Sequence, residues 1–402
     1  MVLAVDAYLI DWLNLVFRWF HVIAAIVWIG TSFYFVALDQ HLHEPAEERD
    51  RERGVGGESW EIHGGGFYRI EKFRVAPPRL PEPLHWYKWE AYWTWLSGFT
   101  LFVVLYYLQP RTYLIDASVA SLSTWEAIAI SIGGLVLAWL VYDLLCRTVG
   151  QRSEAALAAL ILGGVVATAW GATQLFSPRA AYLQVGAMLG TIMAANVFFV
   201  IIPAHRELVR AKQAGREPDP AENRRGKQRS VHNNYLTLPV LFSMLAGHFP
   251  FTYGHSHSWL ILVCLMAIGA WIRLYFNKRH AGETLWWIPL TAALGLAGLA
   301  IWLRPASPAT ATASGEATFA EIQPIVAERC AFCHSLHPKS KQFTTAPAGL
   351  ALDTPQEIVA QAQRIKAVAV DTTFMPLGNQ THMTEAERRK LGAWIDAGAK
   401  TR

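Results

Sequence analysis

The sequence predicts an all-α fold, in which a bundle of eight membrane-spanning helices is followed by a small soluble helical domain. Three observations support this prediction. Hydrophobic residues make up 53% of the 402-residue chain, and long, nearly continuous runs of them lie before residue 304. A stretch rich in Pro, Ala, Thr and Ser follows at residue 305. Beyond it, apolar residues recur at the spacing of an amphipathic helix.

The eight hydrophobic segments approach or exceed the length that a membrane requires. A helix needs about 20 apolar residues to cross a hydrocarbon core of about 30 Å. These segments also lack the polar stripes of a soluble bundle. They are residues 13–38, 92–109, 125–146, 155–176, 182–203, 235–249, 259–276 and 284–303. The sixth is short and contains Pro239, so we expect it to tilt, to break or to be partly buried in protein.

The distribution of Lys and Arg predicts the orientation of the bundle. Residues 41–91 and 204–234 each hold eight Lys or Arg, whereas residues 110–124 hold only Arg111 and residues 250–258 hold none. Because basic residues concentrate in cytoplasmic loops, both chain ends are expected on the outer face of the membrane. The net charge of +4 reflects this topology and gives no reason to expect nucleic-acid binding.

Composition also sets the domain boundaries. Residues 1–304 are predicted to form the integral membrane domain. Residues 305–314 have the composition of a tether that buries nothing. Residues 315–402 are predicted to fold as a separate domain on the outer face.

This C-terminal segment carries a C-x-x-C-H motif, formed by Cys330, Cys333 and His334. The two thiols can each form a thioether to a haem, and the adjacent imidazole then lies beneath the iron as an axial ligand. A zinc site would need two more ligands at suitable spacing, and the other cysteines, Cys146 and Cys264, lie in apolar runs. The motif therefore predicts a covalently bound c-type haem.

Met375 is the predicted sixth ligand of the haem iron. Electron-transfer haems often take a methionine, which raises the reduction potential. Met375 is followed by Pro376 and Gly378, which favour a loop that can wrap the far haem face. Met383, His382 and His337 are weaker alternatives.

Two capping-box patterns predict the helices that frame this motif: Thr318 with Glu321, and Thr384 with Glu387. The second helix would carry Leu391, Trp394 and Ile395 on one face and end near Gly398. With these features, residues 315–402 resemble a class I cytochrome c domain.

Four segments of the chain carry a wider resemblance: HVIAAIVWIG (21–30), HGGGFY (63–68), HWYKWEA (85–91) and HNNYLTLP (232–239). Together with the C-x-x-C-H motif, they resemble the bacterial membrane-bound urate oxidase family over nearly the whole chain. The resemblance implies a multi-span domain fused to a cytochrome c, which oxidises urate to 5-hydroxyisourate in purine breakdown. It further implies a location in the bacterial inner membrane, a periplasmic cytochrome domain, and a respiratory acceptor such as a cytochrome or a terminal oxidase.

Candidate catalytic residues follow from the chemistry of urate, a planar anion at neutral pH. Its pocket should combine flat aromatic surfaces with cationic donors, and Lys88 lies among aromatic residues in the first cytoplasmic loop. A base is also needed, for which His232 and Glu90 are candidates. His232 is preferred because Asn233 and Asn234 follow it. An interfacial aromatic belt with positive-inside charges explains the Lys88 region equally well.

The histidines of the membrane domain suggest a second redox centre. If the first and sixth spans are neighbours, His21 could face His248, and His41 or His205 could face His232; such pairs hold b-type haems or metals. Ionisable groups in a membrane are costly and suggest function. The alternative is a neutral imidazole bonded to a backbone carbonyl. A relay is needed if urate binds from the cytoplasm, but not if it binds on the outer face near His21 and His248.

Four other polar side chains lie within or near the spans: Arg18, Asp143, Asn196 and Arg273. Each is expected to snorkel or to hydrogen-bond a neighbouring helix.

Two other functions remain open at the level of sequence. One is a respiratory cytochrome subunit that oxidises quinol. The other is a transporter with a cytochrome module, favoured by the interrupted sixth span and opposed by the lack of visible inverted repeats.

Overall fold

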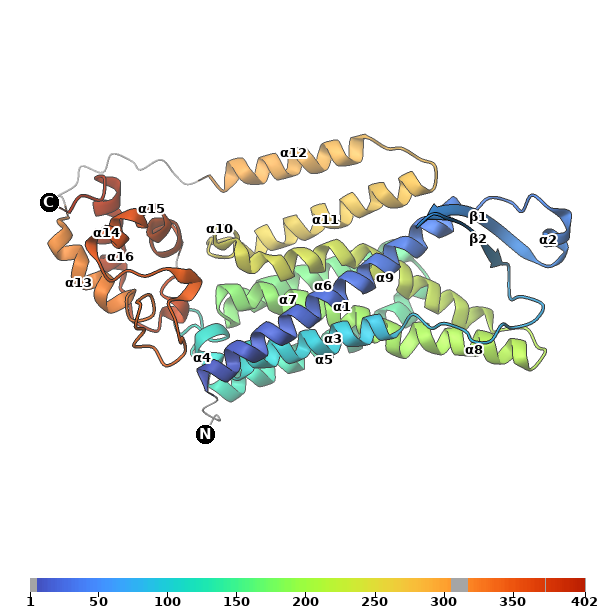
Figure 1. Cartoon of the computed structure of the whole chain (residues 1–402), viewed down its shortest axis with the longest axis horizontal. Helices are drawn as coiled ribbons and strands as arrows, with labels where there is room; N and C mark the ends of the chain where they lie inside the picture. Colours follow the sequence, from blue (N-terminus) through green and yellow to red (C-terminus); the bar gives the residue numbers. More distant parts are fainter. Residues whose placement is uncertain (1–5, 305–316, 373, 402) are drawn as a thin grey trace.

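The computed structural model describes residues 6–304, 317–372 and 374–401. A long helical bundle carries a smaller helical domain at one end and a β-hairpin at the other (Figure 1). The prediction of a mostly helical chain is therefore confirmed, but the hairpin shows that "all-α" is wrong in detail. The predicted linker, residues 305–314, lies outside the described residues.

All eight predicted segments are helical. Short helical turns connect several of the main helices: α4 Pro110–Tyr113, η2 Val149–Gln151, η4 Ala246–His248 and α10 Pro250–Tyr253. The main elements are α1 Ala7–His41, α3 Trp89–Phe102, η1 Val103–Tyr107, α5 Thr124–Thr148, α6 Glu154–Leu175, α7 Pro178–Asn196, η3 Val197–Ile201, α8 Ile202–Gln213, α9 Pro220–Leu245, α11 Ser258–His280 and α12 Trp287–Trp302.

Within the described residues, five helical stretches are long and apolar enough to cross a membrane. They are α1, α5 with η2, α6, α7 through α8, and α11. Helix α12 is apolar but has only 16 residues, α3 has 14, and the first half of α9 is polar. Eight complete spans therefore remain a proposal.

Helix starts in the bundle follow local sequence. Ser123 and Glu126 form a capping box at the start of α5. The Ser177 side chain accepts a hydrogen bond at the start of α7, and Pro178 occupies the first helical position. These signals mark the starts of α5 and α7 in the sequence.

Helix α9 runs unbroken through Pro239. The prediction of a break at this proline was therefore wrong. The prediction of a partly buried segment is confirmed, because Pro239 is buried. A Cβ on Gly269 of α11 would lie 3.3 Å from the Leu238 Cβ, so α11 packs closely beside the proline. Tertiary packing on both sides offsets the lost backbone hydrogen bond.

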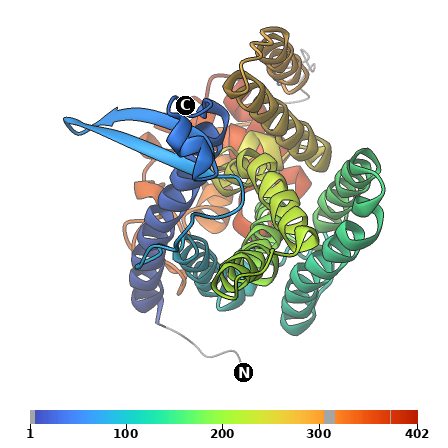
Figure 2. The ribbon, with the colours of Figure 1, turned by 90° about the vertical axis from the view of Figure 1, so that its right-hand side faces the viewer.

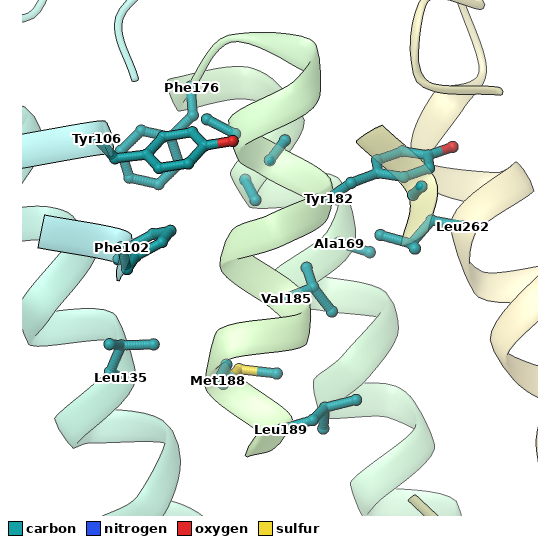
Figure 3. Packing of buried hydrophobic residues seen from close by; sticks show 14 of the residues in the cluster. Phe102, Tyr106, Leu135, Ala169, Phe176, Tyr182, Val185, Met188, Leu189 and Leu262 are labelled. Atoms are coloured by element: carbon teal, nitrogen blue, oxygen red, sulfur yellow. The ribbon is translucent and has the colours of Figure 1, made fainter. Parts of the chain in front are cut away.

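The bundle is held by close helix approaches at small residues. A Cβ on Gly186 of α7 would lie 2.5 Å from the Ser243 Cβ of α9, so only glycine permits this contact. Figure 2 shows the helices end on. Figure 3 shows the buried side chains Tyr182, Val185 and Met188 on α7, which belong to the main apolar core.

The β-hairpin lies between α1 and α3 in sequence. Strands β1 (Val55–His63) and β2 (Gly66–Phe73) pair antiparallel, after the short helix α2 (Glu48–Glu52). Gly64 and Gly65 form the turn with φ of 57° and 80°, as a two-residue hairpin loop requires. The Tyr34 hydroxyl of α1 donates to Glu61 across 2.8 Å, which ties the hairpin to the bundle.

An ion cluster stabilises the base of this hairpin. The Arg69 guanidinium contacts both Asp50 and Glu58. Its hydrogen bonds hold the pKa of both carboxyls below their ordinary values.

The C-terminal domain is built from short helices around one apolar core. The predicted capping boxes at Thr318 and Thr384 are both present. Leu391, Trp394 and Ile395 are buried, as predicted. The elements are α13 Phe319–Arg329, η5 Pro347–Gly349, α14 Pro355–Ala360, α15 Ala362–Ile365, η6 Lys366–Val370, η7 Leu377–Asn379 and α16 Glu385–Asp396.

The C-terminal domain docks on the end of the bundle that carries α4 and α10 (Figure 1). The Gln380 side chain donates to the Arg111 carbonyl across 2.9 Å, and Thr344 donates to Asp11 across 2.9 Å. The loops rich in Lys and Arg lie at the opposite end, which we call the inner end (Figure 1).

Candidate functional site

The C-x-x-C-H motif begins where α13 ends, with Cys330 as its C-terminal cap. Cys330 and Cys333 are both free thiols. The His334 Nδ1 lies 3.1 Å from the Leu350 carbonyl oxygen, so Nδ1 carries the proton and donates. Nε2 is then the unprotonated nitrogen, which is the form that ligates a metal. These three side chains fit the attachment and axial ligation of a c-type haem.

The environment of the thiols opposes a dithiol redox role. Burial raises the pKa of Cys330 to about 12 and raises the pKa of Cys333 as well. Redox-active C-x-x-C pairs have lowered thiol pKa values. In the described part of the chain, no group of three or more His, Cys, Asp or Glu side chains is placed to hold a metal ion.

Met375 lies on the loop between η6 and η7, packed against the apolar core of the same domain. The backbone of this loop is held by Arg388 of α16, which is 5% exposed. Its Nη1 donates to the carbonyls of Ala369 and Met375 at 2.5 and 2.6 Å. The loop that carries the predicted sixth ligand is thus fixed by a buried cation.

A polar cluster lies inside the bundle, where α5, α7 and α9 meet; we call it the His232 cluster. The His232 Nδ1 lies 2.7 Å from the Tyr142 hydroxyl, and the Asn196 amide donates to the same hydroxyl across 3.1 Å. Asn196 also donates to the Asn233 side chain across 2.9 Å. The π-helical turn η3 begins immediately after Asn196, and such turns often occur at functional sites.

The donors of this cluster are consistent with one proton arrangement. The Asn196 amide donates to the Tyr142 oxygen, and the Tyr142 hydroxyl can donate to His232 Nδ1 in the tautomer that carries its proton on Nε2. The His232 Nε2 then carries a proton and faces Glu154 of α6 at 3.7 Å. Tyr142 is 4% exposed, whereas the Glu154 side chain is 65% exposed. The three side chains form a chain of titratable groups from the bundle interior to its surface.

Arg229 adds a positive charge to the His232 cluster. Its guanidinium lies over the Tyr142 ring, 4.8 Å from the centroid, and donates to Asp143 across 2.8 Å. The Nε and Nη1 atoms of Arg229, and the Asn196 Oδ1, are buried without a hydrogen-bond partner among the described residues. Buried polar atoms are normally paired, so unpaired ones indicate a place for a polar ligand or water.

Asn234, the next residue of α9, belongs to a second cluster with α11; we call it the Arg273 cluster. Arg273 Nε donates to the Asn234 Oδ1 across 2.9 Å, and the Asn277 amide donates to the same oxygen across 2.9 Å. The predicted trio His232, Asn233 and Asn234 is thus divided between two clusters.

Lys88 and Glu90 lie elsewhere, at the start of α3. The Lys88 ammonium lies over the rings of Trp86 and Trp89, 5.9 and 5.5 Å from their centroids. The Glu90 Oε2 is buried without a partner among the described residues. No interaction of the described side chains joins either residue to His232.

Two of the histidines considered for a second redox centre have contacts of another kind. The His21 Nδ1 lies 3.0 Å from the Thr94 carbonyl and 3.2 Å from the Ser97 hydroxyl, both on α3. His41 packs against His280, with ring centroids 5.3 Å apart. Across the described side chains, no interaction joins His21 to His248, or His41 or His205 to His232.

The sequence of the bundle matches a known protein family. The model of a family described as "urate oxidase N-terminal" matches residues 7–304.

The chain belongs to the urate oxidase N-terminal family. This membership agrees with the resemblance found in the sequence and suggests a urate-related oxidoreductase. The matched residues contain the His232 and Arg273 clusters but not the C-x-x-C-H domain. Separate searches of curated proteins and of solved structures found no match.

Sequence reasoning missed several residues of the urate oxidase N-terminal region. Tyr142 was not singled out, and Asn196, Asp143 and Arg273 were expected only to snorkel or to bond a neighbouring helix. The hydrogen bonds of Asn196 and Arg273 to α9 confirm the second of these roles. Their side chains are 0% and 4% exposed in the structure, so neither snorkels. The available signal was a polar side chain within an apolar run.

Proposed function

We propose that this protein is a membrane-bound urate oxidase that converts urate to 5-hydroxyisourate and delivers the electrons to a covalent c-type haem. The single observation that carries the proposal is the joining, in one chain, of a urate oxidase N-terminal region to a domain with the C-x-x-C-H arrangement of His334.

The overall reaction balances with water as the oxygen donor. The urate anion and one water give neutral 5-hydroxyisourate, one proton and two electrons; an O–H bond of water is broken and one C–O bond forms at ring carbon 5. Cys330 and Cys333 would hold a c-type haem, with His334 and Met375 as ligands of its iron; the group would supply one-electron redox chemistry. Two electron transfers are therefore needed per urate.

The His232 cluster supplies the proton chemistry of the proposal. His232 is suited to act as a base because its ordinary pKa lies near neutral pH. The chain from Tyr142 through His232 to Glu154 would carry the released proton to the surface of the bundle. Glu90 and Lys88 remain weaker candidates, because they do not contact this cluster.

In this proposal, electrons leave at the end of the bundle that carries the C-terminal domain, and protons leave near the inner end. Asn196 lies 18 residues beyond Pro178, which is about 27 Å along α7. The C-terminal domain docks near Pro178, on the outer, periplasmic side by the positive-inside rule. A second haem or metal in the bundle would relay electrons from the inner end, and the bond of His21 Nδ1 to the Thr94 carbonyl leaves Nε2 in the form that ligates a metal. A respiratory cytochrome or terminal oxidase would then accept the electrons.

Product analysis tests the proposal. Purified protein is incubated anaerobically with urate and excess ferric cytochrome c as acceptor, in water enriched in ¹⁸O. The expected result is 5-hydroxyisourate with one ¹⁸O atom and two acceptors reduced per urate. The double variant Cys330→Ala/Cys333→Ala should form no product with this acceptor. Reduction by ubiquinol but not by urate would favour the quinol-oxidising alternative instead.

A further inference from the structure

Arg273 of α11 is a buried cation without a counter-charge. It is 4% exposed, and no carboxylate of the described residues lies within 4.0 Å of its guanidinium nitrogens. Arg229, the other buried arginine of the bundle, pairs with Asp143 across 2.8 Å. Burying an unpaired charge is costly. The difference between the two arginines therefore requires an explanation.

The side chain of Arg273 is held in one position. Its Nε donates to Asn234 of α9, and its guanidinium lies 3.7 Å from the centroid of the Phe33 ring of α1. A guanidinium stacks favourably on an aromatic face, and this contact leaves the edge of the guanidinium free for hydrogen bonds. The three helices thus present a fixed, planar donor beside a flat wall.

Three polar atoms of this cluster have no partner among the described residues: Arg273 Nη2, Asn234 Nδ2 and Asn277 Oδ1. Their roles are fixed by the bonds that are made. Because Arg273 and Asn277 both donate to the Asn234 Oδ1, Asn234 keeps an N–H₂ donor and Asn277 keeps a carbonyl acceptor. The cluster therefore offers a cationic donor, a neutral donor and one acceptor.

These three atoms favour an anion that can both accept and donate hydrogen bonds. Chloride and other simple anions only accept hydrogen bonds and leave the Asn277 oxygen unpaired, which is costly in a buried site. A planar ring whose edge carries a carbonyl oxygen, an ionised nitrogen and an N–H satisfies all three atoms. Urate and related ionised purines and ureides have such an edge.

The cluster lies near the inner end of the bundle. Arg273 is seven residues before the end of α11 at His280, which is about 10 Å along the helix. His280 and His41 lie beyond it at the same end. A ligand would therefore reach the cluster from the inner side.

We propose that Arg273, Asn234 and Asn277 form a binding site for a planar organic anion, between α1, α9 and α11. The identity of the anion as urate rests on the proposed function; the site itself rests on the unpaired cation and the three unpaired atoms. Arg273 contacts the anion directly, and Phe33 orients the guanidinium.

Equilibrium dialysis of radiolabelled urate tests this site without turnover. The purified full-length protein is reduced with dithionite under nitrogen, so that it cannot accept electrons, and is held in chloride-free buffer. The wild type should bind urate saturably. Arg273→Met should weaken binding by about tenfold or more, because it removes a charge-assisted hydrogen bond. Arg225→Met is the matched control, since Arg225 lies on α9 with a side chain 45% exposed, and it should bind as the wild type does.

A second variant keeps the test decisive if Arg273→Met fails to fold. Asn277→Asp removes the hydrogen bond to Asn234 but places a carboxylate beside Arg273, so the cation gains a partner that offsets this loss and the protein should stay folded. It should nevertheless lose urate binding, because the new charge repels the anion. Urate should raise the unfolding temperature of the wild type and not of this variant.

Two outcomes would overturn the inference in distinguishable ways. If the wild type neither binds nor oxidises urate, both the site and the proposed function fail. If the wild type binds urate and both variants bind it equally well, the site is wrong while the proposed function stands.

Discussion

The Tyr253 ring of α10 packs edge to face against the Phe374 ring of the C-terminal domain, with centroids 5.0 Å apart. Phe374 immediately precedes Met375, the proposed haem ligand. Tyr253 also contacts Tyr182 of α7, with centroids 6.0 Å apart. This pair of rings is thus a direct aromatic contact between the core of the bundle and the loop of Met375.

Replacing Tyr253 should slow electron transfer between the domains. Electron tunnelling falls steeply with distance and with loss of packed atoms, so Tyr253→Leu should reduce the rate of urate-dependent haem reduction several-fold. Tyr253→Phe keeps the ring and should behave as the wild type. Anaerobic stopped-flow absorbance measures both, with haem content as the control. Equal rates in all three proteins would show that electrons do not use this contact.

Gly254 should be intolerant of larger residues for a related reason. A Cβ at this position would lie 2.5 Å from the Thr372 Cβ and 2.9 Å from the Pro250 carbonyl oxygen. Gly254→Val should therefore push the C-terminal domain away from the bundle and expose it to limited proteolysis. Gly133→Val, at an open position on α5, controls for general effects on folding. Identical protease patterns for Gly254→Val and the wild type would contradict this packing.

His232→Ala should lower urate-dependent haem reduction by about 100-fold or more, the usual contribution of a general base. Haem content should not change, because the residue is remote from the C-x-x-C-H motif. Tyr142→Phe removes the hydroxyl bonded to His232 Nδ1 and should shift the pH profile of the reaction with a smaller loss of rate. Steady-state kinetics across pH measure both variants. Wild-type turnover in His232→Ala would remove this residue from the mechanism.

Arg388→Met should release the loop of Met375. It removes two hydrogen bonds from a buried guanidinium to the Ala369 and Met375 carbonyls, each worth on the order of 1.5–3 kcal/mol. The ferric protein should lose the charge-transfer band of methionine ligation, and its reduction potential should fall. Arg389→Met, on the exposed side of the same helix, should change neither. Retention of the band in Arg388→Met would refute the anchoring role.

The C-terminal domain should lose stability in acid through Glu321. A hydrogen bond from Lys390 across 2.7 Å lowers the pKa of Glu321 to about 2. A carboxyl whose pKa is lowered on folding stabilises the protein above its unfolded pKa of about 4.5 and loses this contribution as the pH falls towards 2. Lys390→Met should shift acid unfolding, followed by near-ultraviolet circular dichroism, to higher pH. Superimposable acid transitions would show that this pair contributes nothing.

Features encoded by adjacent residues were predicted well. The capping boxes at Thr318 and Thr384 need only two side chains three positions apart, and both helices begin there. The positions of the hydrophobic helices follow from long apolar runs. The two glycines of the hairpin turn, Gly64 and Gly65, are an equally local signal. The hairpin was nevertheless missed, because the Lys and Arg of residues 41–91 led to the prediction of a cytoplasmic loop.

Features that depend on which helices are neighbours were not predictable. The sequence left open whether His21 faces the sixth span or bonds a backbone carbonyl; in the structure it packs on α3, where a Cβ on Gly98 would lie 2.7 Å from its Cε1. Asn233 and Asn234 are consecutive, yet they point to different helices and serve different clusters. Neither relationship has a sequence signature, because helix adjacency is set by packing across the whole bundle.

The most direct test of the central claim is an anaerobic titration of the oxidised, purified protein with urate, followed by the α absorption band of the haem. We predict that each urate reduces two haems and that the band rises without any added quinol. A fully oxidised spectrum after excess urate, in protein whose haem is reduced by dithionite, would contradict the claim that urate electrons reach the C-x-x-C-H domain.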